Sequence, residues 1–156
     1  MEPLSEEELA SGNAVLNLTD GRLQQITTRP VAGFGLASST DGRRILRYVE
    51  RGTGHLYEVN LNSGLETQLT PRTIANTTEA VFAPDLSSVV IVSGEESRAV
   101  TFMELPNNAE VETELLALAS DAENIEYLTS DLVAYTRNSY TETVGYIFNV
   151  NEQTAS

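Results

Sequence analysis

Hydrophobic and polar residues alternate along most of this chain, in short runs that end at turn-forming residues. In the run 44–50, both sides of an extended strand carry apolar bulk, because isoleucine and valine alternate with leucine and tyrosine. The run Val89–Val92 is continuously aliphatic and β-branched, which is typical of a strand buried on both faces. The pattern predicts an all-β protein whose sheets are covered on both sides.

A short apolar pattern recurs along the chain at a nearly constant distance. Its equivalent residues are separated by 43, 44 and 45 positions: Leu18, Leu61, Leu105 and Val150. Residues 17–27 also align with residues 60–70 without a gap, and both segments hold turn residues between apolar ones. A period in this range is typical of one four-stranded propeller blade per repeat. The sequence therefore predicts β-propeller-type four-stranded blades.

The period divides the chain into a tail and a repeat domain. Residues 1–12 are expected to form an acidic N-terminal tail or a short helix, because a serine precedes three glutamates in a capping-box pattern. Residues 13–156 are expected to form the propeller-type repeat domain. Its predicted units are a partial blade at 13–28, blades at 31–70 and 73–118, and a partial blade at 124–156.

The strand assignments determine how complete each unit is. The first unit is expected to contribute a hairpin of Ala14–Leu18 and Leu23–Thr27 around the turn Asp20-Gly21. Residues 110–118 have a helical composition, but their place in the repeat predicts an outer strand. The last unit is expected to lack a fourth strand, because only six residues follow Val150.

About three blades make an incomplete ring, since a propeller closes with about four or more. Open ends expose sheet faces and edge strands, which favours aggregation. Three arrangements therefore remain open: an excised part of a longer propeller, several chains that complete one ring, or repeats that stack into another open β assembly. In the second arrangement, the strand Leu23–Thr27 would become the fourth strand in another chain's last blade.

The net charge of −14 narrows the choice of partner. Nucleic acid and anionic membranes would be repelled, so the charge serves solubility or marks a patch for cations or a basic protein. The chain has no cysteine, which excludes disulfides and thiolate sites. No apolar run approaches the roughly 20 residues of a membrane helix, and the first residues do not form a signal peptide. We expect no direct membrane insertion by this segment.

Candidate chemistry is sparse, and we predict no catalytic, cofactor-binding or metal-binding residue. His55 is the only histidine and has no second histidine or cysteine as a partner, and no Gly-x-Ser-x-Gly elbow accompanies it. Glu95 and Glu96 are adjacent in one predicted loop, where two carboxylates cannot flank a sugar bond. We therefore interpret the histidine as a packing residue and the glutamates as part of a solvated loop.

Two other sets of charged residues are interpreted structurally. Three aspartates recur with the blades but lack the ligand spacing of an EF-hand calcium loop, so they are expected to cap turns: Asp41, Asp85 and Asp131. The only basic cluster alternates between the two sides of a strand, so its members are expected to pair with carboxylates such as Glu50 or Glu58: Arg43, Arg44, Arg47 and Arg51.

The stretch Arg47–Leu61 resembles the repeats of TolB-like β-propellers, the periplasmic proteins of the Tol system. Those repeats also carry an aspartate-containing turn after the inner strand, here Asp41-Gly42 and Asp85-Leu86. The sequence is still more similar to uncharacterised exported, membrane-anchored propeller-like proteins of candidate-phylum bacteria. Those proteins share the Thr73-Ile74 pair before an inner strand. The likeness covers roughly residues 30–105. It implies a propeller fold, a removed N-terminal anchor and a location outside the cytoplasm.

Three functions fit these observations. The first is a non-catalytic, extracytoplasmic binding or scaffold module that contacts a protein partner, or itself, through blade edges. The alternative is a structural subunit of a surface assembly or filament in which chains complete each other's β-sheets. The second alternative is an accessory domain of a larger enzyme. We expect the first, with no enzyme activity and no cofactor.

Overall fold

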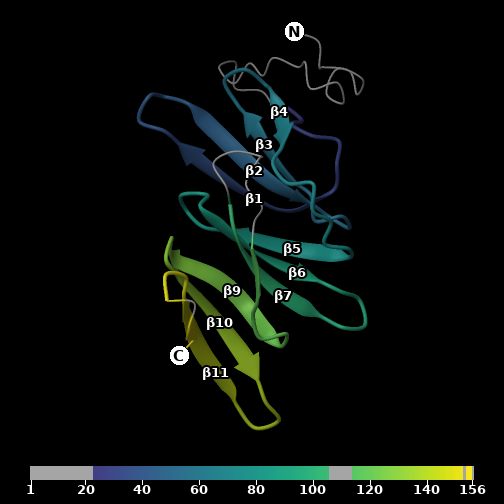
Figure 1. The fold of residues 1–156 in the computed structure, drawn as a ribbon, viewed down its shortest axis with the longest axis vertical. Helices are drawn as coiled ribbons and strands as arrows, with labels where there is room; N and C mark the ends of the chain where they lie inside the picture. Colours follow the sequence, from purple (N-terminus) through teal and green to yellow (C-terminus); the bar gives the residue numbers. More distant parts are fainter. Residues whose placement is uncertain (1–22, 106–113, 153, 156) are drawn as a thin grey trace.

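The computed structural model describes residues 23–105, 114–152 and 154–155. These residues form twelve strands in three antiparallel four-stranded sheets (Figure 1). They include no helix, and therefore none that could span a membrane. The predicted all-β fold with four-stranded, propeller-type blades is confirmed. The predicted tail at 1–12 and the predicted strand Ala14–Leu18 lie outside the described residues.

Blade 1 contains β1 (Val31–Ser38), β2 (Arg44–Glu50), β3 (Leu56–Asn60) and β4 (Glu66–Gln68), paired in that order. The alternation that predicted β2 is visible in its pairing, since Leu46 and Tyr48 lie on one side of the sheet and the residues between them on the other. The β1–β2 turn ends at a glycine with φ +83°, a conformation that other residues rarely adopt.

Blade 2 contains β5 (Thr77–Phe82), β6 (Ser88–Ser93), β7 (Ala99–Glu104) and β8 (Leu115–Ala117). Every residue of β6 is buried, as the aliphatic run predicted, because another sheet covers each of its faces. The outer strand predicted within residues 110–118 is confirmed by β8, while residues 106–113 lie outside the described part.

Blade 3 contains β9 (Ala122–Thr129), β10 (Leu132–Asn138), β11 (Thr143–Asn149) and β12 (Thr154–Ala155). The prediction that this blade lacks a fourth strand was wrong. The few residues after Val150 turn back, and β12 pairs with the end of β11. The ladder between β11 and β12 has only two residue pairs, so a strand of two residues is long enough to form it.

The prediction of a strand at Leu23–Thr27 was also wrong. No residue of this segment belongs to a strand of the described sheets. Ile26 instead packs on the outer side of blade 1, and the Thr27 hydroxyl lies 3.2 Å from the Tyr48 hydroxyl. Apolar contact with the face of a sheet thus takes the place of the predicted strand pairing.

The three sheets are structurally equivalent, and one hydrogen bond shows their register. In each blade, a buried residue after the third strand donates its backbone N–H to a carbonyl near the start of the second strand: Leu61 to Arg44, Leu105 to Ser87 and Val150 to Asp131, at 2.9, 2.8 and 2.9 Å. Leu61, Leu105 and Val150 are therefore the same position in successive blades.

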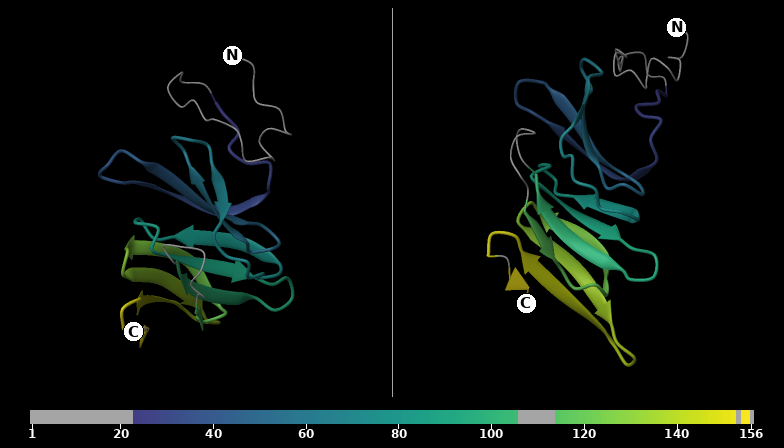
Figure 2. Two further views of the ribbon diagram at one scale, coloured as in Figure 1. Left: turned by 45° about the horizontal axis from the view of Figure 1, so that its top comes forward. Right: turned by 45° about the vertical axis from the view of Figure 1, so that its right-hand side comes forward.

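The blades pack face to face in chain order, with blade 2 in the middle (Figures 1 and 2). One apolar core lies between blades 1 and 2, and includes Val49 and Phe82. Another lies between blades 2 and 3, and includes Val90 and Phe148. We call the side of a blade that is turned toward the earlier blade its preceding face, and the opposite side its following face.

The inner strands of blades 1 and 2 approach closely at two glycines. A Cβ added to Gly33 would lie 1.8 Å from the carbonyl oxygen of Ala80, and one added to Gly35 would lie 2.4 Å from Leu86 and 2.8 Å from Phe82. Only residues without a side chain fit here, which explains the small residues at the start of β1.

A buried hydrogen bond joins blades 2 and 3. The hydroxyls of Ser88 and Tyr127 lie 2.8 Å apart, and both residues are less than 10% exposed. Burial raises the pKa of Tyr127 to about 12 from its usual 10.0, although the hydrogen bond with Ser88 lowers it.

Gly33→Ala should destabilise the protein by about 1–3 kcal/mol, because the new methyl group meets backbone that cannot move without separating the blades. Gly145→Ala is the matched control, since a Cβ at this strand glycine meets nothing within 4 Å. The control should be neutral or stabilising by up to about 1 kcal/mol. Urea denaturation measures both, and equal free energies of unfolding for the two variants would contradict the close approach.

Tyr127→Phe should lower the free energy of unfolding by about 1–2 kcal/mol at neutral pH, because it leaves the buried Ser88 hydroxyl without this partner. Since the folded pKa lies above the unfolded one, the tyrosine's stabilising contribution is complete below pH 10 and is lost as the pH rises toward 12. The variant should therefore lose less stability than the wild type over that range. Denaturation at several alkaline pH values, with the exposed Tyr140→Phe as control, tests this.

Candidate interaction surface on the first blade

The preceding face of blade 1 is a sheet surface that no other sheet of the described residues covers. Its residues alternate along β1, β2 and β3 and continue to the residue after β3: Phe34, Leu36, Leu46, Tyr48, Tyr57, Val59 and Leu61. Four of them form a buried cluster with partly buried neighbours, namely Tyr48, Tyr57, Val59 and Leu61. The apolar side chains on β1 remain outside that cluster.

The exposure of β1 differs sharply from that of the equivalent strand in blade 2. Phe34 and Leu36 are 67% and 55% exposed, whereas Ala80 and Phe82, at the same positions of blade 2, are 7% and 8% exposed. Blade 1 covers the blade 2 residues, and nothing in the described part of the chain covers the blade 1 residues in that way. Large exposed apolar residues grouped on one sheet mark an interaction surface.

A groove of about 300 Å³ runs along this surface. Its apolar floor is formed by β1 and β2, and one wall by Ile26 and Thr27 of the segment before β1. Phe34 lines it from β1 and Leu46 from β2. The preceding segment therefore covers part of the sheet face and leaves the β1 side open.

A stacked pair of tyrosines holds the closed end of the surface. The rings of Tyr48 and Tyr57 lie 5.2 Å apart at 16°, and the Arg29 guanidinium lies 4.5 Å above Tyr57. The Tyr48 hydroxyl donates to the Glu66 carboxylate. Burial, and next the bond to Glu66, raise the pKa of Tyr48 above its usual value, so the phenol stays protonated and keeps donating.

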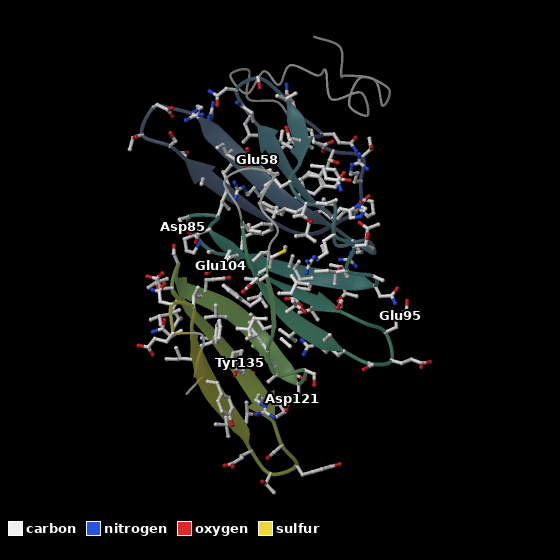
Figure 3. All side chains as sticks on the ribbon, viewed as in Figure 1. Glu58, Asp85, Glu95, Glu104, Asp121 and Tyr135 are labelled. Atoms are coloured by element: carbon white, nitrogen blue, oxygen red, sulfur yellow. The ribbon has the colours of Figure 1, made fainter. Side chains whose placement is uncertain are left out.

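The same arrangement recurs on the preceding face of blade 3, where it lies in a junction. Tyr135 and Tyr146 stack at 5.5 Å and 13°, with Arg137 over Tyr146 at 5.5 Å and an ion pair from Arg137 to Asp121 at 2.8 Å (Figure 3). Tyr135 belongs to the core shared with blade 2. A tyrosine pair of this kind is thus built into a face that another blade covers.

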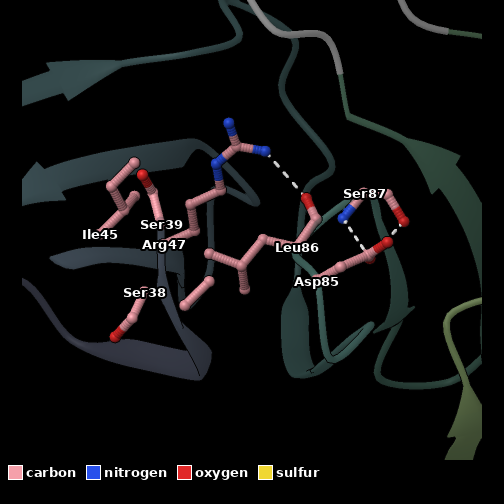
Figure 4. A pocket seen from close by; sticks show the side chains of 8 residues that line it. Ser38, Ser39, Ile45, Arg47, Asp85, Leu86 and Ser87 are labelled. Atoms are coloured by element: carbon pink, nitrogen blue, oxygen red, sulfur yellow. Dashed lines mark hydrogen bonds between the residues drawn. The ribbon is translucent and has the colours of Figure 1, made fainter. Parts of the chain in front are cut away.

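A second cavity of about 430 Å³, whose lining includes Arg47 and Asp85, lies between blades 1 and 2 (Figure 4). Arg47 donates to Glu58 and to the Leu86 carbonyl, at 2.8 and 2.9 Å. Asp85 accepts from the amide and hydroxyl of Ser87, at 3.0 and 2.5 Å. These charged groups already bind partners within the blade junction, so we assign the cavity to the fold.

The histidine and the adjacent glutamates considered as candidate chemistry lie in different loops. His55 contacts the Thr73 hydroxyl at 2.9 Å and lies 3.6 Å from a Glu50 oxygen, in the loop between β2 and β3. Glu95 projects from the β6–β7 loop (Figure 3). Within the described residues, no three histidine or acidic side chains come together as a metal site.

The structural interpretation of the other charged residues agrees with the contacts seen. Asp41 accepts hydrogen bonds from the Ser39 hydroxyl and from the amide and guanidinium of Arg43, so it caps the β1–β2 turn. The Ser39 bond, above all, holds the pKa of Asp41 below its usual value. Asp85 caps the corresponding turn of blade 2, and Arg47 pairs with Glu58 as expected.

Sequence reasoning missed the open face and its tyrosine pair. The available signal was the recurrence of paired tyrosines two repeats apart, Tyr48 with Tyr57 and Tyr135 with Tyr146. Exposure itself leaves no mark in the sequence, because Phe34 and Leu36 have the alternation of covered residues.

No protein-family model matches the chain. A comparison with curated proteins finds no match either. Among solved structures, the chain is similar to TolB from Acinetobacter baumannii, with TM-score 0.54, 17% identity, and coverage of 90% of this chain and 36% of the other. It is also similar to an oligogalacturonate lyase in complex with manganese, with TM-score 0.56, 18% identity, and coverage of 85% and 42%.

The chain thus spans about two fifths of the length of the structures it matches. At this identity the likeness concerns the fold alone. It agrees with the sheet order and the stacking of the blades, and it supports the TolB-like resemblance at the level of the repeat. The described chain is an arc of three β-propeller blades.

Tyr48→Phe should lower the free energy of unfolding by about 1–2 kcal/mol, because it removes the hydrogen bonds to Glu66 and Thr27 at the closed end of the surface. Tyr140→Phe is the control, since that side chain is fully exposed. Urea denaturation compares them. If the two variants were equally stable, the phenol of Tyr48 would have no structural role.

Proposed function

We propose that this chain is a non-catalytic binding module that holds another protein against the preceding face of blade 1. The observation that carries this proposal is the exposure of Phe34 and Leu36, at positions that are buried in blade 2. Two large apolar side chains beside an apolar groove gain free energy when a partner covers them, by about 25 cal/mol for each Å² removed from water.

The two internal junctions indicate the chemistry of the partner. In each, a preceding face is covered by a β-sheet that presents aliphatic side chains, such as Val49 against blade 2 and Val90 against blade 3. The partner of blade 1 is therefore a sheet surface rather than a peptide or a small molecule. Arg29, 40% exposed beside the tyrosine pair, lies 3.7 Å from Glu50 and 3.9 Å from Glu66, so its charge is already paired within blade 1.

The non-catalytic assignment is supported by the polar contacts described above. In the inter-blade cavity, Arg47 binds Glu58 and the Leu86 carbonyl, and Asp85 binds Ser87. The only histidine lies in a loop beside a threonine and a glutamate. An extracytoplasmic location is part of the proposal and is supported by the resemblance to exported TolB-like repeats.

The double variant Phe34→Ser/Leu36→Ser tests whether the face is open. Dilute wild-type protein should bind an apolar-surface dye such as bis-ANS at this face, and the double variant should lose most of the dye fluorescence while unfolding at a similar urea concentration. Val144→Ser, a change at an exposed apolar residue on β11, is the control and should keep the signal. No dye binding by the wild type, or equal binding by the double variant, would reject the proposed surface.

A further inference from the structure

The described chain contains one uncovered face of each kind. Within residues 23–105, 114–152 and 154–155, no sheet lies against the preceding face of blade 1 or against the following face of blade 3. Each of the other four faces lies in a junction between a following face and a preceding face. One uncovered face is a preceding face and the other is a following face. These are the two kinds of face that pack against each other in the junctions inside the molecule.

The following face of blade 3 carries exposed apolar residues on β11 and β9. Ile147 alternates with Phe148, which faces blade 2, and so points the other way. Ile147 pairs with Ala134 of β10. Leu128 lies on β9, on the other side of β10. Ile147 and Leu128 are 43% and 54% exposed, which resembles the exposure of Leu36 on blade 1.

We infer that the occupant of the blade 1 surface is a second copy of this chain, which places the following face of its blade 3 against the preceding face of blade 1. This inference rests on the proposed function and names its partner. Two such junctions, one in each direction, close a ring of six blades from two chains. Six lies within the range of about four to eight blades found in propellers.

The junction between blades 1 and 2 supplies the template. There, Arg47 of a following face reaches the turn before the second strand of the next blade and donates to the Leu86 carbonyl at 2.9 Å. In the junction between copies, the corresponding turn is that of blade 1, which ends at the exposed Arg44. The opposing face carries Glu126, which pairs with Ala134 and is exposed.

Charge therefore agrees with the proposed pairing. Arg44 belongs to the small set of basic residues in a chain of net charge −14, and it would meet a glutamate across the junction. An exposed pair of this kind contributes up to about 1 kcal/mol, so it selects the register while the apolar contact supplies most of the affinity.

A complementation experiment tests the inference. The wild type should sediment as a dimer that dissociates on dilution, while Phe34→Glu and Ile147→Glu should each be monomeric, because each spoils one face of both junctions. An equimolar mixture of the two variants should regain a 1:1 dimer, since one sound junction remains between them. Tyr140→Glu, on the exposed β10–β11 hairpin, should leave the dimer unchanged.

A charge-reversal pair provides a second test at positions where substitution should not affect folding. Arg44→Glu should weaken the dimer by about two- to fivefold for each junction, and Arg44→Glu with Glu126→Arg should restore it. A wild type that stays monomeric at every concentration, grows into longer oligomers, or dimerises regardless of Phe34 and Ile147 would overturn the inference. A monomer that still binds dye at Phe34 would leave the proposed function intact, with a sheet of another protein as its partner.

Discussion

Face-to-face burial of sheets is the interaction on which this structure depends. Each blade is a four-stranded sheet with apolar residues on both sides, and a sheet of this kind is stable only when both sides are covered. Blade 2 satisfies the condition fully, and its β6 strand is buried throughout. Blades 1 and 3 satisfy it on one side. The unsatisfied sides, rather than any catalytic group, are therefore the chemically distinctive surfaces of the molecule.

The two junctions achieve the same burial by different means. Between blades 1 and 2, glycines let the inner strands approach so closely that no methyl group fits, and Arg47 seals the rim with hydrogen bonds to Glu58 and the next turn. Between blades 2 and 3, larger side chains fill the space, and a Ser88–Tyr127 hydrogen bond satisfies the polar groups left inside. The two junctions thus share one sheet geometry but bury their apolar surface with different side chains.

Most of the fold follows from features that repeat in the sequence. The recurring leucines predicted equivalent buried positions, and the aliphatic run Val89–Val92 predicted the doubly covered strand. Two errors have different causes. Leu23–Thr27 has the alternation of a strand, but its Ile26 packs on a sheet face without strand pairing. The strand β12 was missed because two paired residues carry no alternation.

The candidate surface could not be predicted, because alternation shows that a residue faces a partner but not whether that partner belongs to the same chain. Leu36 and Phe82 occupy equivalent positions of their blades and have very different exposure. Only the positions of neighbouring sheets distinguish them.

The segment Leu23–Thr27 has one further consequence. Since Ile26 and Thr27 form a wall of the groove and rest on blade 1 without any strand pairing, they can be moved aside without breaking a β-ladder. Any binding partner that covers the full width of the sheet must displace Ile26 and Thr27, which we call the strap. Its observed affinity would then be lower than its intrinsic one, by the fraction of time the strap is in place.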